Sequence, residues 1–315
     1  MFRFLKMPKG FSKMIHAIVL ILSFYGAIMI TSAGMNPNAT AMSMSMLFVK
    51  EMGFIIIGYI LMVQAARFGK LSTIRKFIFP VALITVVMLL LPLLFDQRGG
   101  AQAWISLPFV NMTIQPSEFA KIVVILLFAT YMGDANTKNK RMFAIVKIPV
   151  VFTLLYTYII IVLQSDLGTG VILFAIGWIL FLIPSIPSLV RAKIIFSLLT
   201  LAGLGLIFWL LTPSGLEFVN RLPLNQYQLS RFNDMADPFT KRYESSYQLF
   251  NGLIAFVKGN WLGIGLGRSV QKLGYLPVAN SDYILAIIVE EMGIIGFLIV
   301  LIGYVMLLFG LIVKA

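Results

Sequence analysis

Cysteine is absent from the 315 residues, and histidine occurs once, as His16. Without cysteine, the chain forms no disulfide and has no thiolate nucleophile or ligand. A single histidine cannot build a His-rich metal site. His16 stands at the start of the first apolar run, and we interpret it as a ring at a membrane interface.

Charge is also scarce, because only 12% of the residues are charged while 60% are hydrophobic. Soluble domains carry roughly a quarter charged residues, so this composition predicts a membrane protein. The N-terminus is basic, but the apolar run 14–33 behind it has no small-residue cleavage site. That run is therefore expected to be a first membrane span rather than a signal peptide.

Apolar segments recur along the whole chain, each about long enough to cross a hydrocarbon core of ~30 Å. We expect one all-α polytopic membrane domain, residues 1–315, with about eight transmembrane helices. The predicted spans are 14–33, 49–66, 77–95, 117–133, 148–164, 168–184, 194–212 and 292–313.

The net charge is +13, and much of the positive charge lies in short stretches between these spans. This distribution argues against a nucleic-acid partner and indicates how the chain is oriented in the membrane. Basic residues gather at the N-terminus, in loops 67–76, 134–147 and 184–193, and at Lys314, whereas the opposite short loops carry only Lys50 and Arg98. The positive-inside rule therefore predicts that both termini are cytoplasmic.

Residues 213–281 then form one large extracytoplasmic loop. The loop holds seven basic and four acidic residues, a net charge of +3. That surplus suggests an anionic partner outside the cell or at the outer leaflet. A solvated loop of mixed charge is the alternative.

Charged residues inside or beside the spans form the strongest site signal, because such residues usually face a cavity or a partner. Glu118 and Lys121 are three residues apart and share a helix face at the outer end of the fourth span. Asp166, Asp282 and the pair Glu290–Glu291 add further charges. Together they predict a polar cavity open to the outer leaflet, although a helix dipole alone would also favour Glu118.

Four motifs carry a family resemblance and keep their order over most of the chain. They are "GGAQAWISLPFVNMTIQPSEFAK" (99–121), "LQSDLGTG" (163–170), "YQLFNGLIAFVKGNWLGIGLGRSVQKLGYLP" (247–277) and "SDYILAIIVEEMGIIG" (281–296). They resemble the FtsW/RodA/SpoVE (SEDS) family, and "SVQKLGYLP" is more similar to the FtsW and SpoVE members than to RodA.

The resemblance implies an enzyme that polymerises lipid II, the undecaprenyl-pyrophosphate-linked disaccharide peptide, into glycan strands at the outer leaflet. The implied partners are a class B penicillin-binding protein and other division proteins, and a divalent cation (Mg or Mn) is a possible cofactor with no assigned ligands. The implied location is the bacterial cytoplasmic membrane, at the septum if the chain is FtsW-like. The implied substrate-binding residues are Trp104, Glu118, Lys121, Asp166, Arg231, Gln248, Lys272 and Asp282.

Two departures from the family pattern bear on catalysis. Lys241 stands where the family has its proposed catalytic aspartate, so the resemblance leaves Asp237, with Asp234 second, as candidate base. The alternative that this chain is a family member without polymerase activity also stays open. The family also has ten spans, so we expect the last two to be missing from this chain.

Two other functions stay open beside the glycosyltransferase. A lipid II flippase would use the intramembrane charges as a path, and a non-catalytic scaffold would position a penicillin-binding protein. The large external loop favours the enzyme over the flippase, and Lys241 favours the scaffold over the enzyme.

Overall fold

The computed structural model describes residues 7–8, 10–35, 40–97, 100–106, 113–133, 142–184, 187–222, 226–237, 239 and 246–314. These residues are overwhelmingly helical, which confirms the all-α class. The chain divides into two compact units, Gly69–Trp209 and a second that joins Met1–Phe68 to Leu210–Ala315. Each unit is described by itself.

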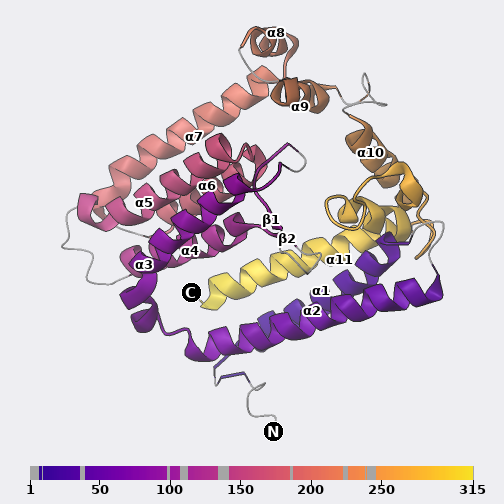
Figure 1. The fold of residues 1–315 in the computed structure, drawn as a ribbon, viewed down its shortest axis with the longest axis horizontal. Helices are drawn as coiled ribbons and strands as arrows, with labels where there is room; N and C mark the ends of the chain where they lie inside the picture. Colours follow the sequence, from indigo (N-terminus) through magenta and orange to yellow (C-terminus); the bar gives the residue numbers. More distant parts are fainter. Residues whose placement is uncertain are drawn as a thin grey trace. The chain divides into compact units, whose positions relative to one another are not determined.

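The unit of residues 69–209 is a helical bundle with one short β-ribbon (Figure 1). Strands β1 (Ile105–Ser106) and β2 (Thr113–Ile114) pair antiparallel, with Ile105 opposite Ile114. The helices are α3 (Leu71–Leu90), α4 (Pro116–Met132), α5 (Met142–Tyr158), α6 (Leu167–Leu182) and α7 (Val190–Leu210), with short turns of helix at Leu91–Leu94, Ile159–Leu163 and Pro187–Leu189.

Polar side chains tie the helices of this bundle together through backbone carbonyls. Tyr156 of α5 donates from its hydroxyl to Ala82 O of α3 at 2.8 Å, and Gln164 donates to Leu89 O at 2.6 Å. Helices α5 and α6 also approach closely, since a Cβ added at Gly177 would lie 2.5 Å from Thr153 Cγ2. Small residues at such crossings are typical of packing between membrane helices.

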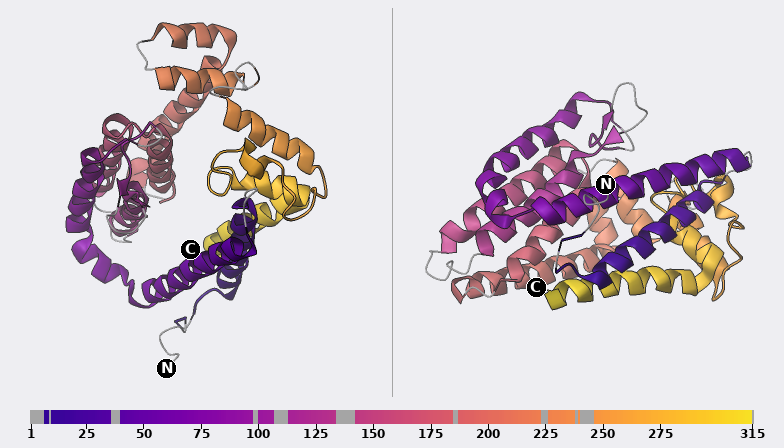
Figure 2. Two further views of the ribbon diagram at one scale, coloured as in Figure 1. Left: turned by 45° about the vertical axis from the view of Figure 1, so that its right-hand side comes forward. Right: turned by 90° about the horizontal axis from the view of Figure 1, so that it is seen from below.

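The other unit contains three long helices and a run of shorter ones. Helix α1 packs against both α2 and α11, and α10 packs against α11 (Figures 1 and 2). Its helices are α1 (Lys13–Ala33), α2 (Ala41–Phe68), α8 (Pro213–Arg221), α9 (Gln226–Ala236), α10 (Tyr247–Gly259) and α11 (Ile284–Lys314), with a turn of π-helix at Gln271–Tyr275.

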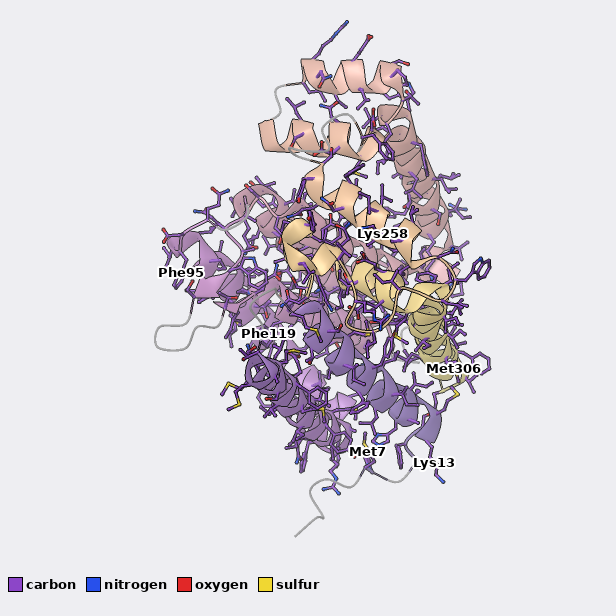
Figure 3. The ribbon with its side chains drawn as sticks, turned by 90° about the vertical axis from the view of Figure 1, so that its right-hand side faces the viewer. Met7, Lys13, Phe95, Phe119, Lys258 and Met306 are labelled. Carbon is purple, nitrogen blue, oxygen red and sulfur yellow. The ribbon has the colours of Figure 1, made fainter. Side chains whose placement is uncertain are left out.

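Small residues also allow close packing between α1 and α11. A Cβ at Gly303 would lie 2.6 Å from Leu22 Cδ2, and one at Gly310 would lie 2.7 Å from Met14 Cε. Elsewhere the long helices present apolar side chains outward, as with Met306 of α11, which is 41% exposed (Figure 3). That exposure suits a surface that faces lipid.

Each of the eight predicted spans coincides with a helix, α1 to α7 and α11. Six helical segments in the described part are long and apolar enough to cross a membrane, and α6 is apolar but shorter. Helix α11 begins at Ile284, but Gly293 has non-helical φ/ψ angles and kinks it. The part after this kink agrees closely with the predicted span 292–313, and the shorter part before it carries Glu290 and Glu291. The segment 213–281 is not an irregular loop but is largely built of α8, α9, α10 and the π-turn.

Candidate functional site

Glu290 and Glu291 of α11 are a pair of fully buried carboxylates, 0% and 1% exposed. Glu290 accepts a hydrogen bond from the hydroxyl of Ser269. It also accepts from the backbone amides of Val270 and Gln271, both at 3.3 Å. Glu290 thus accepts from groups at and just before the start of the π-turn Gln271–Tyr275.

Glu291 forms an ion pair with Lys272, whose Nζ lies 2.7 Å from Glu291 Oε1. The other carboxylate oxygen accepts from Ser32 of α1 at 2.6 Å, and Lys272 Nζ lies 3.2 Å from the same hydroxyl. Three segments far apart in sequence therefore meet at one buried charge cluster. A buried ion pair needs such additional hydrogen bonds to offset its desolvation.

Glycines let the segment after α10 approach α11 closely enough for this cluster. A Cβ at Gly263 would lie 2.2 Å from Glu291 O, and one at Gly293 would lie 2.3 Å from Trp261 O. Both glycines have positive φ, 76° and 65°, which side-chain-bearing residues rarely adopt. The sequence "GNWLGIGLG" therefore packs backbone against backbone.

Asp234 and Asp237, the two candidate bases, have different environments. Asp234 lies in α9, is only 8% exposed and accepts from the Ser246 hydroxyl at 2.7 Å. Asp237 follows the end of α9, is exposed, and accepts from the amide of Phe239 at 2.9 Å. Of the two, Asp237 is the carboxylate that a substrate can reach.

The remaining predicted residues of this unit are spread over separate elements. Gln248 of α10 and Asp282 before α11 are both exposed, whereas Lys272 is buried against Glu291. The side chains of Arg231 and Lys241 lie outside the described residues. The binding roles of Gln248, Asp282, Lys272 and Arg231 stay predictions, and Lys272 has in addition a structural contact that the sequence did not reveal.

Glu118 and Lys121 form the predicted pair in the first turns of α4. Lys121 Nζ lies 2.7 Å from Glu118 Oε1, with the side chains 22% and 57% exposed. Pro116 opens this helix at a position where its missing N–H costs nothing. Phe119, between the two, is 48% exposed (Figure 3). The pair is therefore at the surface of this unit and open to a ligand.

Asp166 caps the N-terminus of α6 and is part of a second polar group in the same unit. Its carboxylate accepts from the amide of Thr169 at 3.0 Å and from its hydroxyl at 2.7 Å. Gln115 donates to Asp166 Oδ2 at 3.1 Å, which links the start of α4 to the start of α6. Trp104, just before β1, is 36% exposed. The role of Asp166 in binding stays a prediction, but its capping contact is clear.

Sequence reasoning missed the neutral partners of these charges. Four neutral side chains each donate a hydrogen bond to one of these carboxylates: Ser269, Ser32, Ser246 and Gln115. Their local sequence gives no sign of this role. Within the described ranges, no three Asp, Glu or His side chains gather as a metal site. A cation there would have to depend on one or two carboxylates together with substrate phosphate, as Mg²⁺ often does.

The helices and the buried and exposed charges define an all-α, multi-pass membrane protein with titratable side chains on the helical segment between α7 and α11. The chain belongs to the FtsW/RodA/SpoVE family of cell cycle proteins, whose model matches residues 12–315. The predicted family is thereby confirmed.

Individual relatives agree with this assignment. The chain is 33% identical over 310 residues to the probable peptidoglycan glycosyltransferase FtsW of Bacillus subtilis, covering 96% of this chain and 74% of the relative. It is 33% identical over 308 residues to the protein of the same name from Haemophilus influenzae, covering 96% and 73%. A solved chain from a peptidoglycan synthase complex that coordinates polymerization and crosslinking has a TM-score of 0.61 at 19% identity, covering 93% and 75%. That likeness supports the fold.

Proposed function

We propose that this protein is a peptidoglycan glycosyltransferase that polymerises lipid II into glycan strands at the outer leaflet, in cell division or cell-shape control. The observation that carries the proposal is the 33% identity, over 96% of the chain, to a protein named for that activity. An exposed carboxylate at the end of α9, Asp237, supplies the chemical group that the reaction needs.

The proposed reaction joins two sugars and releases a pyrophosphate. Asp237 accepts the proton of the acceptor sugar hydroxyl, whose oxygen then forms a bond to the anomeric carbon of the donor. The bond from that carbon to the undecaprenyl pyrophosphate breaks, and the pyrophosphate leaves with the electron pair. A positioned general base contributes about 10²–10⁴ in rate.

Cationic groups stabilise a leaving pyrophosphate. Lys121 is the candidate in α4, where Glu118 holds its ammonium at 2.7 Å. A divalent cation (Mg or Mn) is proposed as an aid, and when bound it would neutralise phosphate charge. Asp237 would be its protein ligand in the alternative in which this carboxylate is not the base.

Location and partners follow from the same proposal. The protein would lie in the bacterial cytoplasmic membrane with both termini cytoplasmic, at the septum in a dividing cell. A class B penicillin-binding protein would crosslink the strands, and other division proteins would bind the pair. The family membership and the apolar helices support this placement.

The test is synthesis of glycan from purified lipid II by the full chain, with and without a class B penicillin-binding protein. We expect product from the parent protein and none from Asp237→Ala, with equal expression. Glu217→Ala, which removes a carboxylate from α8 of the same segment, is the matched control and should be active. Full activity in Asp237→Ala would remove Asp237 as the base.

A scaffold without catalytic activity is the second candidate, favoured by Lys241 at the family's aspartate position. This scaffold hypothesis predicts the opposite result in the same assay. The parent protein would make no glycan, Asp237→Ala would be silent in cells, and Lys241→Asp would create activity. Comparing these three proteins separates the two functions.

A further inference from the structure

Glu51 is an ionisable residue well inside the membrane-spanning helix α2. This helix has 28 residues, so at about 1.5 Å per residue it is ~42 Å long, more than a hydrocarbon core of ~30 Å. Measured from Arg67 at its basic end, Glu51 lies about 24 Å along the axis. If the positive-inside rule places Arg67 at the cytoplasmic boundary of the core, the backbone of Glu51 lies ~6 Å inside the outer boundary.

A cavity of about 400 Å³ lies between α1 and α2 and has Glu51 in its wall. The α2 side is one helix face, with Glu51, Gly58 and Tyr59 among its members, and the α1 side includes Ser23. Both helices belong to one compact unit. The groove thus combines apolar walls with a few polar groups.

No other described residue satisfies the charge of Glu51. Glu51 and Ser23 form no hydrogen bond or ion pair within the described part of the chain. The neighbouring ammonium of Lys50 lies over the ring of Phe54 instead, 5.9 Å from its centroid. Carboxylates inside membrane spans are costly and almost always face a partner.

We propose that this groove binds a transmembrane helix of a partner protein that carries a lysine or arginine about 6 Å inside the outer boundary of the core. Charge complementarity to Glu51 selects the cation.

The walls favour a helix over a lipid tail. A Cβ at Gly58 would meet nothing within 4 Å, and Ser23 is also small, so a second backbone has room to approach. Small residues and interhelical hydrogen bonds are the features that join membrane helices. This site is independent of the proposed transferase function, since no residue of that chemistry lines the groove.

The test uses synthetic Leu-Ala transmembrane helices and the full chain in vesicles of phosphatidylglycerol with and without phosphatidylethanolamine. One helix carries a single Lys at the stated depth, a second carries Leu there, and a third carries the Lys near its opposite end. Because the chain has no cysteine, Ser45→Cys on α2 takes a single donor dye for energy transfer.

We expect the Lys helix to bind at least about tenfold more tightly than the other two, and Glu51→Gln to abolish that preference. Glu217→Gln on α8 is the matched control and should keep it. Gly58→Leu fills the groove without touching the carboxylate and should also block binding, with helix content unchanged by circular dichroism.

Three results would overturn the proposal. The first is equal binding of all three helices, or a preference that survives Glu51→Gln. The second is phosphatidylethanolamine retained by the parent protein in native mass spectrometry and lost in Glu51→Gln, which would make the groove a lipid site. The third is self-association of the chain that depends on Glu51, which would make the occupant a second copy.

Discussion

Lys272 Nζ lies 2.7 Å from Glu291 Oε1, and neither side chain is more than 1% exposed. The pair joins the stretch after α10 to α11, and the Ser32 hydroxyl adds α1 to the same cluster. This contact is shielded from solvent. Loss of either side chain should therefore lower the stability of the protein, and any effect on activity should follow from that loss.

Breaking this pair from one side should destabilise the protein strongly. Lys272→Met leaves a buried carboxylate without its cation, and removing one partner of a buried pair typically costs about 3–5 kcal/mol. The double variant Lys272→Met/Glu291→Gln removes both charges and keeps one carbonyl oxygen, which can accept from the Ser269 amide or from the Ser32 hydroxyl. It should therefore lose less than the two single variants summed. Reversible unfolding in detergent micelles measures all three.

Lys258→Met is the matched control for this cycle. Lys258 is exposed in the last turn of α10 (Figure 3), so its loss should change the free energy of unfolding by less than about 0.5 kcal/mol. Strict additivity of Lys272→Met and Glu291→Gln would contradict a direct interaction.

This cluster also marks where sequence reasoning stops. Hydropathy predicted every long helix, because an apolar run of about 20 residues has few other stable states. Lys272 and Glu291 lie 19 residues apart, and their meeting depends on a path through Gly263 and Gly293 that no periodicity encodes.

The candidate carboxylates show the same limit. Asp234 and Asp237 lie in one polar stretch and look equivalent in sequence, yet a hydroxyl 12 residues away, from Ser246, helps to bury one of them. The sequence could identify the stretch as a candidate site, but it could not rank its members by accessibility. Burial follows from long-range packing, which a single sequence does not show.

Asp166 should behave as a helix cap whatever else it does. Asp166→Ala removes the acceptor for Thr169 at the start of α6 and should cost about 1 kcal/mol. Asp166→Asn keeps a cap acceptor and should cost less than half of that. Unfolding of both variants in micelles is the measurement, and equal losses would contradict the cap. Lost glycan synthesis in the stable Asn variant would support the predicted binding role.

The predicted topology can be tested directly because the chain lacks cysteine. Ser214→Cys lies in exposed α8, and Ser72→Cys lies in the exposed first turn of α3. If the positive-inside rule orients this chain, a membrane-impermeant maleimide labels Ser214→Cys in intact cells, and Ser72→Cys only after permeabilisation. The reverse pattern would place residues 213–281 in the cytoplasm and end the proposal of an outer-leaflet activity.

Asp234 should matter for stability and Asp237 should not. Asp234→Ala removes the buried partner of Ser246, and a hydrogen bond to a charged group contributes about 1.5–3 kcal/mol. Asp237→Ala changes an exposed side chain and should stay within about 0.5 kcal/mol. Thermal unfolding compares the two, with Ser246→Ala expected to resemble Asp234→Ala. A large loss in Asp237→Ala would mean that its inactivity reports misfolding rather than a missing base.

Glu118 and Lys121 should be needed for function and nearly dispensable for folding. An exposed ion pair three residues apart contributes about 0.3–0.5 kcal/mol, too little for either loss to unfold α4. We therefore expect Glu118→Gln and Lys121→Ala to insert and melt like the parent protein, yet fail to support growth or make glycan. Phe119→Leu, on the same turn and apolar, is the silent control.

The exchanged pair Glu118→Lys/Lys121→Glu separates a binding role from a structural one. It restores an ion pair at the same spacing but moves the ammonium one helical turn toward the N-terminus of α4, where the helix dipole disfavours it. Binding of a ligand that depends on the ammonium at Lys121 will not be recovered, so this variant should stay inactive while its stability stays within about 0.5 kcal/mol of the parent. Restored growth would show that function depends only on an ion pair at these two positions. Glu118 would then have a structural role, as a carboxylate in the first turn of the helix.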